Sequence, residues 1–112
     1  MDASLLFDSG RAILRQGANV ELDRIGGFLQ VFAPNKLIIE GHSDSDGSIE
    51  DNLALSQQRA EAVRGGYLVN SFEWIKPGMI DALGYGEERP RVKNTTSDNK
   101  QLNRRIEFTV ID

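Results

Sequence analysis

Residues 39–59, IEGHSDSDGSIEDNLALSQQR, form the stretch that decides the fold of this chain and points to its functional site. The stretch begins at the end of a β-branched run, which predicts a buried strand, and continues into an acidic loop that contains glycine. A helical pattern follows, and we expect the helix to begin at Ser56, or a turn earlier, near Asn52. Ligands of folds with this order tend to bind where loops leave the carboxyl ends of strands. We therefore expect the functional site in the loop after Ile39.

Two charged residues of this stretch are expected to lie at one pocket. Asp44 lies at the exit of the strand, and Arg59 would be the third residue of a helix whose N-cap is Ser56. The free N–H groups and the positive end of that helix would join Arg59 in binding a carboxylate, while Asp44 would bind an ammonium group. One fixed anion and one fixed cation suit a zwitterion. The pattern indicates a protein that binds an amino-acid-like group, and not an enzyme.

Asn52 and Arg104 are further candidates for the same site. Asn52 could add a neutral amide, and Arg104 could reach the mouth of the pocket if the last strand lies next to the central one. A simpler alternative stays open, in which Asp44 and Arg59 pair with each other or both lie in solvent. Exposed pairs of this kind are common and contribute little to stability.

The acidic loop also resembles part of a calcium-binding loop. With His42 at the first position, Asp44, Asp46 and Gly47 fall where ligands and the turn glycine belong. The first ligand would then be a histidine and the twelfth would be Leu53, so both strong ligands are missing. His42 is the only histidine, and one histidine with two loop acids is too few strong ligands for a typical metal site and a weak basis for acid–base catalysis. We expect a structural histidine, no metal, no cofactor and no catalytic residue.

The composition is that of a globular protein and argues against several functional classes. The 112 residues suffice for one domain, with 39% hydrophobic and 27% charged residues. The formal charge of −4 argues against a nucleic-acid-binding surface. Cysteine is absent, and no segment approaches the roughly 20 apolar residues of a membrane span. The first residues lack the pattern of a secretion signal. These features fit either a cytosolic protein or a domain of a longer exported protein.

The periodicity predicts an α+β fold in a single domain of residues 1–112, a two-layer βαβαββ sandwich. We expect a mixed four-stranded sheet with both helices on one face. The predicted strands are residues 5–7, 36–40, 79–85 and 105–110, and the predicted helices are residues 16–32 and 56–70. Residues 72–78 are expected to form a connector, and residues 87–100 read as polar and turn-rich. A glycine pair, Gly65-Gly66, should weaken the second helix.

Three motifs give the chain a resemblance to a known family. They are Gly41-His42-Ser43-Asp44 at the strand exit, the pattern Asn-x-x-Leu-Ser-x-x-Arg-Ala over residues 52–60, and Asn103-Arg104-Arg105 at the start of the last strand. In this order and spacing the chain resembles the OmpA-like peptidoglycan-binding domain. That family includes the C-terminal part of OmpA, the peptidoglycan-associated lipoprotein Pal, and the periplasmic part of the flagellar stator protein MotB. The match begins at Phe7-Asp8-Ser9-Gly10 and covers nearly the whole chain.

The resemblance implies non-covalent binding of peptidoglycan through the diaminopimelate residue of its stem peptide. In the family, the residues that match Asp44 and Arg59 hold the amino and carboxylate groups of diaminopimelate. The positions that match Asn52 and Arg104 lie at the same site. Ser43 stands where threonine is commoner and keeps the hydroxyl, so it completes the predicted set.

The resemblance also implies a periplasmic domain of a Gram-negative envelope protein, itself outside the membrane, that anchors its parent to the cell wall. Whether the parent is a porin, a lipoprotein, a stator or a secretion component is left open. Two alternatives remain. One is a MotB-like domain in which a homodimer matters more than the wall, and the other is a wall hydrolase that uses His42, Asp44 and Asp46.

Overall fold

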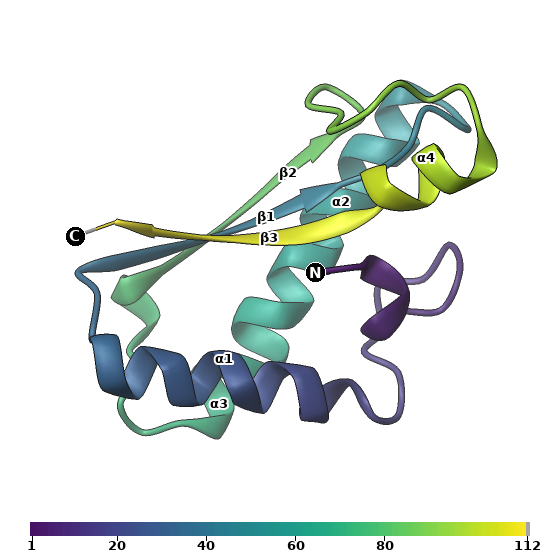
Figure 1. Cartoon of the computed structure of the whole chain (residues 1–112). Coiled ribbons are helices and arrows are strands. Elements are labelled where there is room, and N and C mark those ends of the chain that lie inside the picture. Colours follow the sequence, from purple (N-terminus) through teal and green to yellow (C-terminus); the bar gives the residue numbers. More distant parts are fainter. Residues whose placement is uncertain (112) are drawn as a thin grey trace.

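The central strand β1 (Lys36–His42) lies between two edge strands in a mixed sheet of order β2-β1-β3. It pairs in parallel with β2 (Ile80–Gly86) and antiparallel with β3 (Arg105–Ile111), as Figure 1 shows. The structure, a computed structural model, describes residues 1–111. The three longest predicted strands are thus present within a residue or two of their expected bounds.

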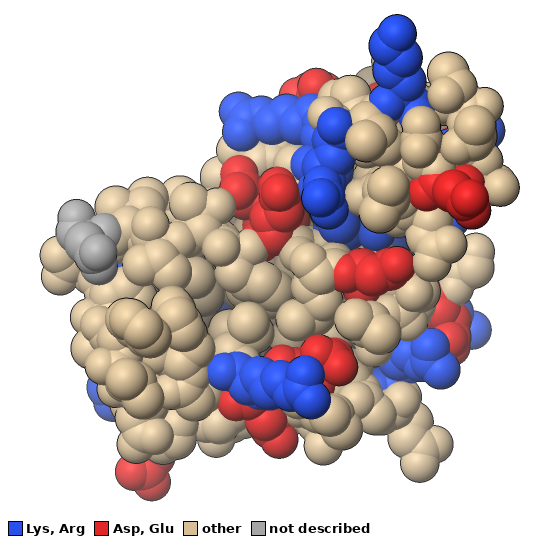
Figure 2. All heavy atoms as spheres, viewed as in Figure 1, with Lys and Arg blue, Asp and Glu red and all other residues tan. Residues whose placement is uncertain are grey.

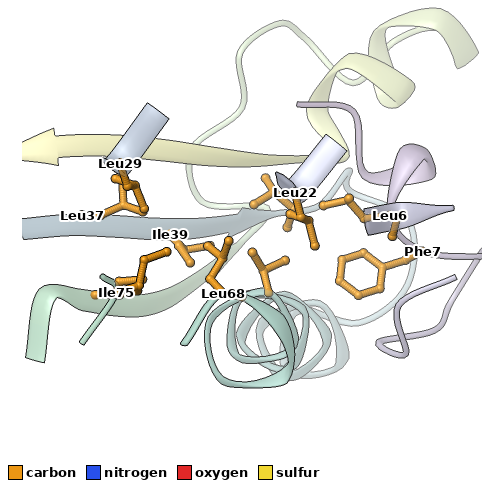
Figure 3. Packing of buried hydrophobic residues seen from close by; sticks show 13 residues of the cluster. Leu6, Phe7, Leu22, Leu29, Leu37, Ile39, Leu68 and Ile75 are labelled. Atoms are coloured by element: carbon orange, nitrogen blue, oxygen red, sulfur yellow. The ribbon is translucent and has the colours of Figure 1, made fainter. Parts of the chain in front are cut away.

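Two long helices cover one face of the sheet, as predicted for a two-layer α+β fold. They are α1 (Ala18–Phe32) and α2 (Ile49–Val63). In Figure 3, Leu29 of α1 points toward Leu37 of β1, and Leu68 points toward Ile39. Each side chain of this size contributes about 1.5–3 kcal/mol when fully buried. The core consists of Leu6, Phe7, Ala18, Leu22, Leu29, Leu37, Ile39, Ala60, Val63, Leu68, Ile75, Ile80 and Ile106. No helix within residues 1–111 is long and apolar enough to cross a bilayer.

The start of α2 differs from the prediction. The helix begins at Ile49, two turns before Ser56, and its N-cap is Ser48, whose Oγ accepts a hydrogen bond of 3.1 Å from the Asp51 N–H. The acidic side chains of Glu50 and Asp51 suit the positive end of a helix. This polar first turn lacks the apolar stripe that marks the later turns, so the periodicity placed the start too late. The loop after β1 is therefore short.

The helix α2 becomes irregular at the glycine pair Gly65-Gly66, which is expected to weaken it. The helix continues into a π-helical turn, η2 (Arg64–Leu68), which contains Gly65 and Gly66, and then into α3 (Val69–Ser71). The connector of residues 72–78 follows and leads through the short turn η3 (Pro77–Met79) into β2. Trp74 in this connector donates a hydrogen bond of 2.9 Å from Nε1 to the Gly26 carbonyl, which ties it to α1.

The predicted first strand, residues 5–7, is wrong, and the sheet of the described residues has three strands instead of four. The segment forms a 3₁₀ turn, η1 (Ala3–Leu5), capped by Asp2, whose side chain accepts a hydrogen bond of 2.8 Å from the Ser4 N–H. Within residues 1–111, the β-bridge of Phe7 to Leu14 is an isolated one. A short apolar run does not distinguish a strand from a turn that buries its side chains. Here the hydrogen bond from the Ser4 N–H to the Asp2 side chain favours the turn.

The helix α4 (Ser97–Asn103) lies partly in the segment predicted to be turn-rich. Thr96 caps it, because its Oγ1 accepts a hydrogen bond of 3.1 Å from the Asn99 N–H. The buried Asn103 side chain accepts from the Arg91 N–H at 2.8 Å and donates to the Val92 carbonyl at 2.9 Å. These bonds fix the end of α4, and with it the following residue, Arg104.

The backbone of α2 comes very close to the sheet at two glycines. A Cβ at Gly41 would lie 2.3 Å from the Ser56 carbonyl oxygen, and a Cβ at Gly84 would lie 2.3 Å from the Gln57 nitrogen. The Gln57 side chain also accepts a hydrogen bond of 2.7 Å from the Gly84 N–H, so the helix covers part of the edge of β2. This contact sets the distance between Arg59 and the loop after β1.

Gly84→Ala should lower the free energy of unfolding by about 1–3 kcal/mol or more, because the added methyl group would meet backbone atoms that cannot move aside. Urea unfolding of the purified protein measures this change. Gly27→Ala is the matched control, because a Cβ at this exposed position of α1 meets no atom within 4 Å. It should raise the free energy of unfolding by about 0.5–1 kcal/mol. Equal stability of the two variants would contradict the close contact.

Candidate functional site

A cavity of about 510 Å³ opens between the loop after β1, the helix α2 and the first ten residues. The structure brings all five predicted site residues together around it, namely Ser43, Asp44, Asn52, Arg59 and Arg104. Its other lining residues are Ala3, Ser4, Phe7, Ser9, Gly10, Asp46 and Leu55. Lys and Arg side chains gather over the end of the molecule that carries α4, with carboxylates between them (Figure 2).

Asp44 is the buried anion of the cavity. The residue is 6% exposed, and both carboxylate oxygens are engaged. Oδ1 accepts a hydrogen bond of 2.9 Å from the Asp46 N–H, and Oδ2 pairs directly with Nη1 of Arg104. Asp44 therefore does not pair directly with Arg59 in this structure, in contrast to the simpler alternative. The partner of Asp44 is Arg104, whose half-exposed side chain lies at the mouth.

Arg59 is the buried cation, with 7% of the residue exposed. Its Nε donates to the Arg11 carbonyl at 2.8 Å and its Nη2 donates to the Asp8 carbonyl at 3.3 Å. The guanidinium carbon lies 5.2 Å from the centre of the Phe7 ring. These contacts hold the guanidinium plane and leave Nη1 without a hydrogen bond to residues 1–111.

The two guanidinium groups influence each other. Burial lowers the pKa of Arg59, and the positive charge of Arg104 lowers it further. Arginine remains protonated at neutral pH, so two positive charges face one cavity. A carboxylate placed there would relieve this repulsion and accept charge-assisted hydrogen bonds.

One part of the predicted geometry is wrong. Because α2 begins at Ile49, Arg59 lies in the third turn of the helix, and the free N–H groups of the helix end do not reach it. Ser56 is not an N-cap. Its Oγ donates to the Leu53 carbonyl at 3.0 Å and accepts from the Gly86 N–H at 2.9 Å. The second positive group at the site is thus Arg104 instead of a helix end.

Asn52 and Ser43 shape the loop. The Asn52 side chain donates from Nδ2 to the carbonyl oxygens of Asp46 at 2.9 Å and Asp44 at 3.3 Å. The Ser43 hydroxyl donates to the Asp44 carbonyl at 2.9 Å. Gly47, with φ of 85°, allows the tight turn between Asp46 and the start of α2. In this structure these polar groups hold the backbone that presents the Asp44 carboxylate.

Sequence reasoning missed the contribution of the first ten residues as one wall of the cavity. Phe7, Ser9 and Gly10 line it, and Asp8 supplies a carbonyl oxygen to Arg59. The motif Phe7-Asp8-Ser9-Gly10 carried the signal, since it belongs to the family resemblance. Nothing in its periodicity places it beside α2.

His42 lies outside the cavity, next to β3. Its ring is buried and stacks on Tyr85 at a centroid distance of 5.4 Å. Nε2 is 3.1 Å from a Glu107 carboxylate oxygen, but the angle does not suit a hydrogen bond. Burial lowers the pKa of His42 most, followed by the charge of Arg105. Among residues 1–111, no group of three His, Asp or Glu side chains is placed to hold a metal ion.

The family model described as the OmpA family matches residues 6–104. The chain is similar to outer membrane porin F of Pseudomonas aeruginosa, with 34% identity over 104 residues, covering 93% of this chain and 29% of the porin. It is also similar to the peptidoglycan-associated lipoprotein of Pseudomonas putida, with 37% identity over 74 residues, covering 66% of this chain and 43% of the lipoprotein. The chain therefore spans less than half the length of these relatives.

A solved structure has the same fold. The cell wall anchor of the T6SS from Pseudomonas aeruginosa superimposes with a TM-score of 0.82 and 27% sequence identity. The superposition covers 99% of this chain and 78% of that one.

The burial of His42 predicts a loss of stability in mild acid. The unfolded chain protonates this histidine near its ordinary pKa of 6.5, whereas burial lowers the pKa of His42 in the folded protein, so the folded state binds fewer protons at that pH. The contribution of His42 to the free energy of unfolding is therefore present above the pKa of the unfolded chain, and it is lost as the pH falls from there through the lowered pKa of the folded protein. His42→Phe, which keeps a ring on Tyr85, should lose less stability than the unmodified protein between pH 7.5 and 5.5 in urea titrations. An equal loss in both proteins would rule out His42 as the source.

Proposed function

The chain belongs to the OmpA family, and from this premise we propose that it binds peptidoglycan non-covalently through the diaminopimelate residue of the stem peptide. The binding would anchor an envelope protein to the cell wall, with this domain in the periplasm. One relative is named for its association with peptidoglycan, and a protein of the same fold is described as a cell wall anchor. These names support the proposal for this chain.

The observation that carries the proposal is one cavity with one buried carboxylate and two guanidinium groups, those of Asp44, Arg59 and Arg104. The free end of diaminopimelate in a stem peptide carries an ammonium group and a carboxylate on one carbon. Its carboxylate would bind between Arg59 and Arg104, and its ammonium group would bind Asp44. Planar guanidinium groups suit a carboxylate better than an ammonium group would.

The ion pair between Asp44 and Arg104 gives a reason for selecting a zwitterion. A ligand ammonium group can replace Arg104 at Asp44, while the ligand carboxylate takes up Arg104. Every charge then keeps a partner after the exchange. A ligand with a carboxylate alone would compete with Asp44 for Arg104 and leave the buried carboxylate unpaired, which is costly. The exchange therefore favours ligands that carry both charges.

The site supports binding instead of catalysis. The only histidine lies outside the cavity, and the Ser43 hydroxyl donates to a backbone carbonyl. A hydrolase would need a base beside a nucleophile or an activated water molecule. A homodimer of the domain stays a prediction, which sedimentation of the purified protein at several concentrations would test.

Asp44→Asn and Arg59→Lys should each weaken pull-down by diaminopimelate-type peptidoglycan severely. Removing one partner of a desolvated charge pair costs about 2–5 kcal/mol, and an ammonium group cannot reproduce the bonds of the Arg59 guanidinium. Asp81→Asn is the matched control, because it removes the same charge from a residue of β2. The Asp81 carboxylate lies 3.3 Å from the ammonium group of Lys36, at the end of β1 that is remote from the site. Unchanged binding by both site variants would reject the assigned site.

Acetylation of the free amino group of the stem peptide tests the exchange directly. The acetylated peptide keeps its carboxylate but cannot pair with Asp44, so its affinity in calorimetric titration should fall at least tenfold, about 1.4 kcal/mol. Asp44→Asn should bind both peptides about equally weakly, since it has already lost the same interaction. If acetylation weakens binding to Asp44→Asn as much as to the unmodified protein, Asp44 is not the partner of the ammonium group.

A further inference from the structure

Two ion pairs join α4 to the loop after β1. The Lys100 ammonium group lies 3.0 Å from Oδ1 of Asp46, and Arg104 pairs with Asp44. The two cations are one helical turn apart, with a hydrogen bond of 3.1 Å from the Arg104 N–H to the Lys100 carbonyl. The two acids are two residues apart in the loop. Lys100 and Asp46 therefore lie beside the pair that the proposed ligand would exchange.

The two acids differ in exposure and in role. The Asp44 side chain is 9% exposed and lies inside the cavity, whereas the Asp46 side chain is 66% exposed and lines its mouth. The backbone of Asp46 is held from both sides, since its N–H donates to Asp44 and its carbonyl accepts from Asn52, each at 2.9 Å. These bonds do not involve Lys100. The Asp46 carboxylate would therefore stay at the mouth without its cation.

We propose that Lys100 determines which stem peptides the cavity accepts, by neutralising the Asp46 carboxylate at its mouth. The inference rests on the proposed function of the same site. A stem peptide that carries a second free carboxylate beside the zwitterion must bring that charge past Asp46. With Lys100 in place the mouth carries no net charge from this pair, and the second carboxylate is admitted.

Lys100 acts through Asp46, because Asp46 lines the cavity and Lys100 contacts it from α4. Removing the ammonium group would leave an unopposed negative charge at the mouth. The resulting repulsion acts through a partly solvated region, so its effect should be modest, on the order of three- to tenfold in affinity, and smaller at high salt. A ligand without the second carboxylate would not experience it.

The test uses two stem peptides that share the zwitterionic diaminopimelate end and differ only in a second carboxyl group, which is free in one and amidated in the other. Calorimetry at low salt gives, for each protein, the ratio of its affinity for the free-carboxylate peptide to its affinity for the amidated peptide. Lys100→Met should weaken binding of the free-carboxylate peptide about three- to tenfold and change the amidated peptide less than about twofold. Asp46→Asn should shift the ratio the opposite way, because Lys100 is then unopposed. The double variant Asp46→Asn/Lys100→Met should restore the original ratio.

Lys36→Met is the matched control, since it removes the same charge from a lysine paired with Asp81 at the far end of β1. It should leave the ratio unchanged. An unchanged ratio in Lys100→Met, an equal loss for both peptides, or failure of the double variant to restore the ratio would overturn the role of Lys100. If the unmodified protein binds neither peptide, the proposed function itself fails, and this inference fails with it.

Discussion

The contact between the backbone of α2 and the backbones of β1 and β2 is the constraint on which the site depends. It exists because Gly41 and Gly84 have no side chains at the points where Ser56 and Gln57 meet the sheet. The N–H groups of Gly84 and Gly86 on β2 donate hydrogen bonds to side chains of α2, and these bonds hold the helix in this position. Since Arg59 follows one turn later on the same helix, the contact also sets where the buried guanidinium lies relative to the loop that carries Asp44.

Electrostatics then decide what such a cavity can hold. The Arg59 guanidinium and the acidic loop that carries Asp44 are kept in place by neutral partners. These are the carbonyl groups of Asp8 and Arg11 for Arg59, and backbone N–H and side-chain amide groups for the loop. Buried charges are stable only when they are paired or hydrogen-bonded. In the free protein Arg104 supplies the partner of Asp44, and its half-exposed position makes it the member of the pair that can move at least cost. The site of the free protein is therefore charged and internally paired.

Much of the fold could be predicted from local patterns. The alternation of β3 and the stripe of α1 repeat with the periods of a strand and of a helix, and the continuous apolar run of β1 is typical of a buried strand. Each of these patterns therefore indicates its own conformation. The errors fall where several local outcomes are nearly equal in energy. Asp2 and Ser48 are polar caps, and each determines a turn or a helix start that the neighbouring apolar residues do not indicate. The helix α4 is short and polar, so it depends on its cap at Thr96 and on the buried Asn103.

The sequence by itself determined the family, the residue types of the site and the charge balance that suits a zwitterion, because these follow from side-chain chemistry and motif spacing. Only the tertiary structure decided the pairing: Asp44 with Arg104, Asp46 with Lys100, and Arg59 with the carbonyl groups of the first loop. These partners are 48 to 60 residues apart along the chain. No local pattern specifies such a pairing, since it arises from how helices and loops pack on the sheet, and a shift of one helical turn would exchange one partner for another.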